Sequence, residues 1–348
     1  MQRALFLAER GRGTTTPNPV VGAVVVSADG VVDGQGAHRI AGGPHAEVFA
    51  LDAAGSRARG GTLYCTLEPC CHTGRTGPCA ERVAAAGIAR VVAALEDPNP
   101  RVAGGGFAFL RERGVRVDTN VEHRAAARQT APFVTWVAKR RPHVTLKAAV
   151  SADGLAGRPD AAVKLTGPAM DRAMHRQRAA VDAIAVGSTT VMVDDPQLTA
   201  RLVYRQRPLI RVVFDRRGRV MPSARLFQTL DAGPVIMFMS VRVEASRRAD
   251  DLRAAGATVV ALPESGAIAA ALGMLAERDV LSLLVEGGST LQRAMWDAGV
   301  VDRVQLIETP VRVGQGVAAF VPELRGENVT RCVHGADTVV EWDVHRTD

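Results

Sequence analysis

The sequence predicts an α/β protein with two domains, and three observations support this prediction. The chain has 348 residues, which is long for one average domain and suits two. Short apolar runs alternate with segments of helical periodicity, each bounded by Gly or Pro, as is typical of layered α/β structure. A charged, proline-containing run at 139–142 (KRRP) interrupts the alternation. We therefore expect one domain over residues 1–142 and a second over 143–348.

The first half is predicted to fold as a sheet with helices packed against it. Apolar runs rich in Val, Leu and Thr predict its strands, and amphipathic stretches that begin or end at Gly or Pro predict its helices. The expected strands cover residues 20–27, 62–66 and 90–94, and the expected helices cover 2–10, 45–54, 79–86 and a stretch around Trp136.

The second half restarts the alternation at His143 with more continuous apolar runs. Such runs predict strands that are buried on both faces, as in parallel sheets. The expected strands cover residues 143–150, 182–187, 208–215, 234–239, 257–262, 281–286 and 303–310, and the expected helices cover 167–180, 247–255, 268–277 and 290–298.

Composition narrows the possible classes of protein. Hydrophobic residues make up 47% and charged residues 23%, the mixture of an ordinary globular protein. The longest apolar runs are far below the roughly 18 residues that a membrane helix needs, and the N-terminal apolar patch is too short for a secretory signal. We therefore expect a cytoplasmic protein without a membrane span.

Charge and cysteine usage indicate the partners. The net charge of +7 favours anionic partners such as phosphorylated metabolites or cofactors. Aromatic residues are only 4% and there is no dense basic run, which argues against a nucleic-acid surface. Three of the five cysteines cluster at Cys70, Cys71 and Cys79, which indicates a metal site rather than a disulfide framework. Cys332 is expected to be a small hydrophobic residue.

His45, Cys70 and Cys79 are the expected metal ligands. One imidazole and two thiolates suit Zn²⁺ and leave a fourth position for water, whose pKa zinc lowers to about 7. Glu47 stands two residues after His45, so it is poorly placed as a neighbouring ligand but can reach that water and carry protons. This division of roles is typical of zinc deaminases. The alternative is a structural zinc site with Cys65, Cys71 or His72 as fourth ligand, which would leave Glu47 without a purpose.

The motifs of the first half resemble those of a known family. Residues 16–22 (TPNPVVG), 45–47 (HAE) and 66–79 (TLEPCCHTGRTGPC) resemble the bifunctional riboflavin-biosynthesis deaminase and reductase. Eight residues separate the two cysteine ligands, whereas cytidine and tRNA adenosine deaminases usually have two. The resemblance implies a cytidine-deaminase-like α/β/α domain and a pyrimidine substrate that carries a ribose phosphate. The residues implied to contact this substrate are Asn18, His38, His72 and Arg75.

Three stretches of the second half resemble the reductase half of the same family, whose fold is like that of dihydrofolate reductase. They are residues 147–154 (KAAVSADG), 190–201 (TVMVDDPQLTAR) and 285–291 (VEGGSTL). In the last stretch, amide groups at a helix start can face a pyrophosphate, although a Gly pair before a helix is otherwise a simple turn. The resemblance implies a catalytic Lys147 and a substrate site formed by Arg178, Leu198, Arg201 and Glu286. The residues that it implies along NADPH are Ala149, Thr190, Asp194, Gly287, Gly288, Ser289 and Thr290.

A basic turn at 216–219 (RRGR) is the expected site for the 2′-phosphate of NADPH. The family position nearest the cofactor aligns with Arg216, and the alternative is a solvent-exposed basic turn. Lys164 stands where the family usually has a tryptophan, which leaves cofactor contact at that position in doubt.

The sequence thus predicts a bifunctional enzyme with one zinc ion and NADPH as cofactors. The first domain is expected to deaminate 2,5-diamino-6-(5-phosphoribosylamino)pyrimidin-4(3H)-one by hydrolysis. The second is expected to reduce the ribosyl group of 5-amino-6-(5-phosphoribosylamino)uracil to ribityl. The expected partners are phosphorylated pyrimidines, without nucleic acid or membrane, in a homo-oligomer. Two alternatives remain: a nucleic-acid deaminase, and a deaminase whose reductase-like domain is inactive.

Overall fold

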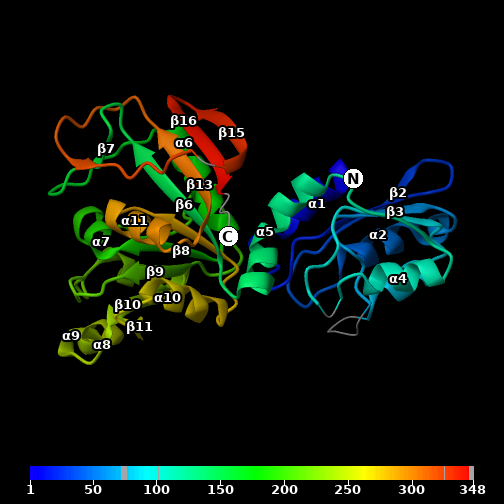
Figure 1. The fold of residues 1–348 in the computed structure, drawn as a ribbon, viewed down its shortest axis with the longest axis horizontal. Coiled ribbons are helices and arrows are strands. Elements are labelled where there is room, and N and C mark those ends of the chain that lie inside the picture. The colour runs from blue at the N-terminus through cyan, green and yellow to red at the C-terminus, as the bar shows by residue number, and fades with distance from the viewer. Residues whose placement is uncertain (72–76, 101, 325, 345–348) are drawn as a thin grey trace. The chain divides into compact units, whose positions relative to one another are not determined.

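The computed structural model describes residues 1–71, 77–100, 102–324 and 326–344. The chain divides into two compact units, Met1–Arg140 and Arg141–Asp348, and each unit has its own main sheet (Figure 1). Among the described residues, no helix combines the length and the apolar character that crossing a membrane requires. Two residues expected to bind substrate, His72 and Arg75, lie outside the described residues.

The first unit contains a five-stranded sheet in the order β2-β1-β3-β4-β5. Strands β3, β4 and β5 run parallel, and β1 is antiparallel to both of its neighbours. The strands are β1 (Gly22–Val26), β2 (Val32–Ala37), β3 (Thr62–Cys65), β4 (Arg90–Ala93) and β5 (Arg116–Asp118). The α-helices are α1 (Gln2–Ala8), α2 (Ala46–Ala54), α3 (Cys79–Ala85), α4 (Gly105–Glu112) and α5 (His123–Lys139). Two 3₁₀ turns, η1 (Glu9–Gly11) and η2 (Gly55–Ala58), complete the unit.

Helix α2 packs closely on β1 and β2, and glycine makes this approach possible. A Cβ atom at Gly34 or Gly36 would collide with the carbonyl oxygens of Ala50 or Ala46. The helix faces the sheet with the small side chains of Ala46, Ala50 and Ala54, all of which are buried. Since α2 begins directly after His45, this close packing also sets the position of the first expected metal ligand.

The second unit contains a nine-stranded sheet in the order β11-β10-β9-β8-β12-β6-β13-β16-β15. The strands from β11 to β13 are parallel, and β16 and β15 extend the sheet antiparallel. The strands are β6 (His143–Val150), β8 (Ala183–Gly187), β9 (Ile210–Phe214), β10 (Val235–Ser240), β11 (Ala257–Leu262), β12 (Ser282–Glu286), β13 (Val301–Glu308), β15 (Gly326–His334) and β16 (Asp337–Val344). Strands β7 (Leu155–Gly157) and β14 (Val317–Ala318) form a separate two-stranded sheet.

Helices lie against the large sheet of the second unit, as Figure 1 shows. They are α6 (Pro168–Ala180), α7 (Ser188–Asp194), α8 (Val241–Glu244), α9 (Arg247–Ala254), α10 (Ala267–Ala276) and α11 (Ser289–Asp297), with the 3₁₀ segment η3 (Arg225–Ala232). Strands β8, β10 and β12 are almost entirely buried. The prediction of an α/β fold with buried parallel strands is therefore confirmed.

Several elements were not predicted from the sequence. They include β2, α4, α7 and the terminal hairpin of β15 and β16. The expectation for Cys332 was wrong, because it lies exposed on strand β15 with its Sγ 3.5 Å from Nε2 of His334. Nearly all of β15 is exposed, so a cysteine there is not covered by a hydrophobic core.

Candidate active sites

Three element boundaries bring the expected zinc ligands of the first unit together. His45 is the residue before α2, Cys79 is the first residue of α3, and Cys70 lies in the segment that follows β3. The backbone holds the two cysteines in register, because Ala80 N–H donates to the Cys70 carbonyl at 3.0 Å. The N–H of Cys79 also donates to Cys70 Sγ at 3.3 Å. The site is therefore built from the starts of two helices and the segment that follows β3.

The geometry of these side chains fits one zinc ion. The Nδ1 atom of His45 lies 3.2 Å from Cys79 Sγ and 3.6 Å from Cys70 Sγ, and the three ligand atoms lie within 4.8 Å of one another. Ligands bound to one zinc at about 2.0–2.3 Å have such separations. Among the described residues, neither Cys65 nor Cys71 joins this cluster. The donor set is thus one imidazole and two thiols, as in catalytic zinc sites with one open position.

Glu47 lies beside this cluster in the first turn of α2. Its side chain is 4% exposed, and within the described part of the chain its Oε2 atom has no hydrogen-bond partner. Burial raises the pKa of this carboxyl group. Glu47 lines the same cavity as His45, and a carboxylate at this position can accept a proton and release it again.

A cavity of about 420 Å³ adjoins the cluster. His38 lines it, with its Nδ1 3.0 Å from the Pro44 carbonyl and its Nε2 3.1 Å from Asn18 Nδ2. The structure therefore brings two of the residues expected to bind substrate, Asn18 and His38, to the cavity that also contains Glu47. Phe133 and Trp136 of α5 line it too. Sequence reasoning missed both as site residues, and their rings offer flat apolar faces to a heterocycle.

Glu68 is a further residue whose role the sequence did not indicate. The residue is 3% exposed, and its carboxylate accepts four backbone hydrogen bonds at distances from 2.8 to 3.1 Å. The donors are the N–H groups of Asp97, Gly104, Gly106 and Phe107. Glu68 thus joins the segment that carries Cys70 to the start of α4 and to a loop that lines the cavity.

In the second unit, neighbouring parallel strands bring Lys147 and Glu286 together. The two residues pair in the register of β6 and β12, and Lys147 Nζ lies 3.7 Å from Glu286 Oε2. Arg178, from the last turn of α6, donates to both oxygens of Glu286, at 2.8 Å from Nε and 2.7 Å from Nη2. Burial alone would raise the pKa of Glu286, but Arg178 and then Lys147 outweigh it and lower the pKa to about 2.

The other two residues expected to contact substrate lie on the segment after α7. Leu198 is buried, with a left-handed backbone (φ 55°), whereas Arg201 is exposed. The carbonyl of Thr199 accepts a hydrogen bond from Arg178 Nη1 at 3.1 Å. The structure therefore unites Arg178 with Glu286 and joins them to this segment through Thr199.

A cavity of about 680 Å³ in the second unit fits a dinucleotide such as NADPH. Two adjacent glycines, Gly287 and Gly288, have positive φ values of 103° and 81°, and a Cβ at either would press on Thr190 Oγ1 at 3.2–3.3 Å. Gly287 and Ala149 do not line the cavity, and Ala149 packs against a hydrophobic cluster that includes Met170 and Ile307. The residues expected at the cofactor that do line it are Thr190, Asp194, Arg216, Gly288, Ser289 and Thr290.

The basic turn expected to bind the 2′-phosphate lies at this cavity. Arg216, Arg217 and Arg219 all line it. Arg216 forms an exposed ion pair with Glu264 at 3.0 Å, while Arg219 Nη2 donates to Ser188 Oγ and Thr189 Oγ1 at 2.8 and 3.0 Å. Guanidinium groups suit the 2′-phosphate that distinguishes NADPH.

Lys164, which departs from the family pattern, is paired within the second unit. Its Nζ lies 2.8 Å from Asp171 Oδ2, and its side chain is exposed. Thr166 donates to the other carboxylate oxygen of Asp171 at 3.1 Å. The lysine therefore forms an ion pair with the first turn of α6. The neighbouring Val163 lines the cofactor cavity instead.

Comparisons with known proteins agree with this geometry. Residues 1–95 match the cytidine and deoxycytidylate deaminase zinc-binding region, and residues 142–338 match the RibD C-terminal domain. The chain is 37% identical to the riboflavin biosynthesis protein RibD of Aquifex aeolicus (strain VF5), covering 91% of this chain and 88% of that protein. It is 38% identical to RibD of Escherichia coli (strain K12), covering 90% and 88%.

Solved structures of similar proteins have the same fold over nearly the whole chain. Acinetobacter baumannii RibD superposes with a TM-score of 0.83 at 32% identity, covering 99% of this chain and 98% of that one. A Thermotoga maritima protein described as a diaminohydroxyphosphoribosylaminopyrimidine deaminase/5-amino-6-(5-phosphoribosylamino)uracil reductase gives 0.85 at 33%, covering 99% and 97%.

These matches confirm the predicted pairing of a cytidine-deaminase-like fold with a reductase fold like that of dihydrofolate reductase. They identify Zn²⁺ as the cofactor of the deaminase part and NADPH as the cofactor of the reductase part. The chain belongs to the RibD family of riboflavin-biosynthesis proteins and is a bifunctional enzyme, a deaminase and a reductase.

Proposed function

We propose that the first unit hydrolyses the 2-amino group of 2,5-diamino-6-(5-phosphoribosylamino)pyrimidin-4(3H)-one. His45, Cys70 and Cys79 hold the zinc ion, which when bound activates water for hydrolysis. Glu47 takes a proton from the water and delivers it to the departing amino group, so that one water is consumed and one ammonia is released. The observation that carries this proposal is the buried Glu47 Oε2, which has no hydrogen-bond partner among the described residues, beside a three-ligand cluster.

Asn18 and His38 are proposed to orient the pyrimidine in the 420 Å³ cavity. Burial lowers the pKa of His38, so its ring is neutral at pH 7 and can donate one hydrogen bond and accept another. Phe133 and Trp136 provide faces for the ring of the substrate. His72 and Arg75 remain predictions for contact with the substrate.

The second unit is proposed to reduce the ribosyl group of 5-amino-6-(5-phosphoribosylamino)uracil to a ribityl chain. NADPH, when bound, supplies the hydride for C1′ of the sugar. The bond between C1′ and the ring oxygen breaks as the sugar opens, and we propose that Lys147, whose Nζ lies 3.7 Å from Glu286 Oε2, supplies the proton that this oxygen requires. Arg178 and Glu286 position Lys147 and the substrate. The phosphorylated substrate and NADPH are both anions, which also accounts for the net charge of +7.

A two-signal assay tests this function. Purified protein is first mixed with the diaminopyrimidine phosphate, and the release of ammonia is measured. NADPH is then added, and its oxidation is measured. The proposal predicts both signals, with NADPH oxidation dependent on prior ammonia release. Ammonia release without NADPH oxidation would favour the deaminase with an inactive reductase-like domain. The absence of both signals would refute the assignment. A homo-oligomer and a cytoplasmic location remain predictions from the sequence.

A further inference from the structure

Helix α6 presents Arg178 to Glu286 from its last turn, so the position of this helix end matters to the reductase site. The last carbonyl groups of any helix lack partners within the helix. Helix α6 ends in an extended residue, Val181 (φ −102°, ψ 158°), rather than in a left-handed glycine cap. Its terminal carbonyl groups therefore need donors from another part of the chain.

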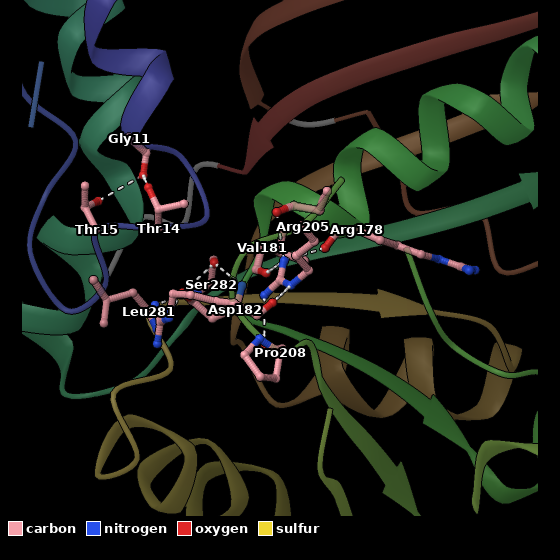
Figure 2. Close-up of polar contacts among 12 residues, drawn as sticks. Gly11, Thr14, Thr15, Arg178, Val181, Asp182, Arg205, Pro208, Leu281 and Ser282 are labelled. Carbon is pink, nitrogen blue, oxygen red and sulfur yellow. Dashed lines mark hydrogen bonds and ion pairs between the residues drawn. The ribbon is translucent and has the colours of Figure 1, made fainter. Parts of the chain in front are cut away.

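The side chain of Arg205 supplies these donors, as Figure 2 shows. A cation is favourable at the C-terminal end of a helix, where carbonyl groups give a negative potential. The two N–H bonds of Arg205 Nη1 are shared among three carbonyl oxygens, those of Arg178 at 2.9 Å, Ala179 at 2.8 Å and Val181 at 2.7 Å. Its Nε and Nη2 donate to the carbonyls of Arg207 and Pro208. Burial lowers the pKa of Arg205 to about 10, so it remains a cation at neutral pH.

The connection that follows α6 is held from a second direction. Asp182 Oδ2 accepts hydrogen bonds from Leu281 N–H at 3.1 Å, Ser282 N–H at 3.0 Å and Ser282 Oγ at 2.8 Å (Figure 2). Ser282 begins strand β12, and Glu286 ends it. The connection is thus tied to the strand that carries the acidic partner of Arg178, while Arg205 ties the helix end to the segment of Arg207 and Pro208.

The segment that carries Arg205 contacts Arg178 twice. The Thr199 carbonyl accepts a hydrogen bond from the guanidinium group of Arg178, and Arg205 donates to its backbone carbonyl. A bidentate pair with Glu286, at 2.8 and 2.7 Å, requires the guanidinium group to lie in the plane of the carboxylate. A shift of the helix end by about 1 Å would break one of these two hydrogen bonds.

From this arrangement we propose that Arg205 is a positioning residue for the reductase reaction. It fixes the last turn of α6 so that Arg178 meets Glu286 with both donors and leaves Lys147 correctly aligned with the substrate. Arg205 itself does not contact the reacting groups and acts through Arg178. The inference rests on the proposed reductase function of the second unit.

The test compares three variants of the full-length protein. Arg205→Gln should lower reductase kcat/KM for the pyrimidine substrate by roughly tenfold to a hundredfold, the effect of a misplacement of about 1 Å. The KM for NADPH and the deaminase rate, which serves as an internal control, should stay within about twofold of wild type. Arg205→Lys keeps the cation at the helix end and should restore much of the loss. Arg207→Gln is the matched control, because the half-buried side chain of Arg207 pairs with Asp182 at 3.4 Å among the described residues, and this variant should change kcat/KM by less than about twofold.

An unchanged kcat/KM in Arg205→Gln would overturn the inference, and so would an equal rise in the KM for NADPH. If Arg205→Gln does not fold, the comparison rests on Arg205→Lys. Arg205→Lys should fold and show a smaller fall in kcat/KM. If it instead has the wild-type kcat/KM and a lowered melting temperature, the role of Arg205 is purely structural. The wild-type protein separates the two proposals: if it does not oxidise NADPH, the proposed function and this inference both fall. If it does and Arg205→Gln matches it, only the inference falls.

Discussion

Glu68 shows how one buried carboxylate can hold a catalytic loop. Its four backbone hydrogen bonds need an acceptor on both oxygens, and the amide of glutamine would turn an N–H₂ group toward at least one N–H donor. We predict that Glu68→Gln lowers the free energy of unfolding by about 3 kcal/mol. Chemical denaturation followed by fluorescence measures this, with the exposed Glu112→Gln as control. A change no larger than that of the control would show that these hydrogen bonds contribute little.

Arg216 and Arg217 are expected to recognise the 2′-phosphate of NADPH. The ion pair of Arg216 with Glu264 is exposed, and such pairs contribute only about 0–1 kcal/mol, so a phosphate group can replace the carboxylate. We predict that Arg216→Ala combined with Arg217→Ala raises the KM for NADPH roughly tenfold or more and leaves the KM for NADH nearly unchanged. Steady-state kinetics with both cofactors test this. Equal effects on the two cofactors would remove the claim.

The metal ligands and the proton carrier were accessible from the sequence because their residue types and spacing carry the chemistry. The structure brings the ligand atoms of His45, Cys70 and Cys79 within 4.8 Å. Glu68 gives no comparable signal, because its role depends on the path of the loop that returns to it. The pairing of Arg178 with Glu286 likewise depends on strand order and helix packing, and the sequence indicated it only through the family resemblance.

Among the strands, those with apolar runs were predicted from the sequence, whereas polar or exposed strands were not. The buried strands β8, β10 and β12 were predicted nearly to the residue. Strand β2 (VDGQGA) has no apolar pattern, because its glycines serve the close approach of α2. Strand β15 is exposed along almost its whole length, so it lacks the alternation that marks a half-buried strand.

Strand β6 begins with a buried histidine, and this burial makes the stability of the second unit depend on pH. Burial lowers the pKa of His143 to about 4, against an ordinary value of 6.5. Between these two pH values the unfolded chain binds a proton that the folded chain excludes, so stability is complete above pH 6.5 and falls as the pH drops toward 4. The loss from this group amounts to about 3 kcal/mol.

Unfolding curves measured across this pH range test the effect. We predict a shallower pH dependence in His143→Gln, since glutamine has no proton to gain. His123 is exposed, so His123→Gln should keep the wild-type slope. An identical slope in wild type and His143→Gln would show that other groups govern the acid sensitivity.

At the scale of the whole molecule, the chain is a bifunctional enzyme whose two candidate sites lie in separate compact units. We propose that residues 1–142 form the deaminase domain and residues 143–348 the reductase domain. The zinc cluster and the first cavity use residues of the first unit, and the Lys147–Glu286 pair and the second cavity use residues of the second. Loss of one cofactor should therefore leave the other activity intact.

Removal of zinc tests this independence. After dialysis against a chelator, ammonia release should fall at least about a hundredfold, since the hydrolytic water is no longer activated. NADPH oxidation with the deaminated substrate should stay within about twofold of the untreated protein. Added zinc should restore ammonia release. A parallel loss of both activities would mean that the reductase depends on the metal site.

The central claim is that His45, Cys70 and Cys79 hold zinc while Glu47 carries protons without binding the metal. The most direct measurement is the zinc content of Glu47→Gln, made alongside its rate of ammonia release. We expect one zinc ion per chain, as in the wild type, with ammonia release lowered by roughly a hundredfold or more. Loss of zinc from the variant would mean that Glu47 binds the metal, and retained zinc with ammonia release at the wild-type rate would mean that Glu47 does not carry the proton.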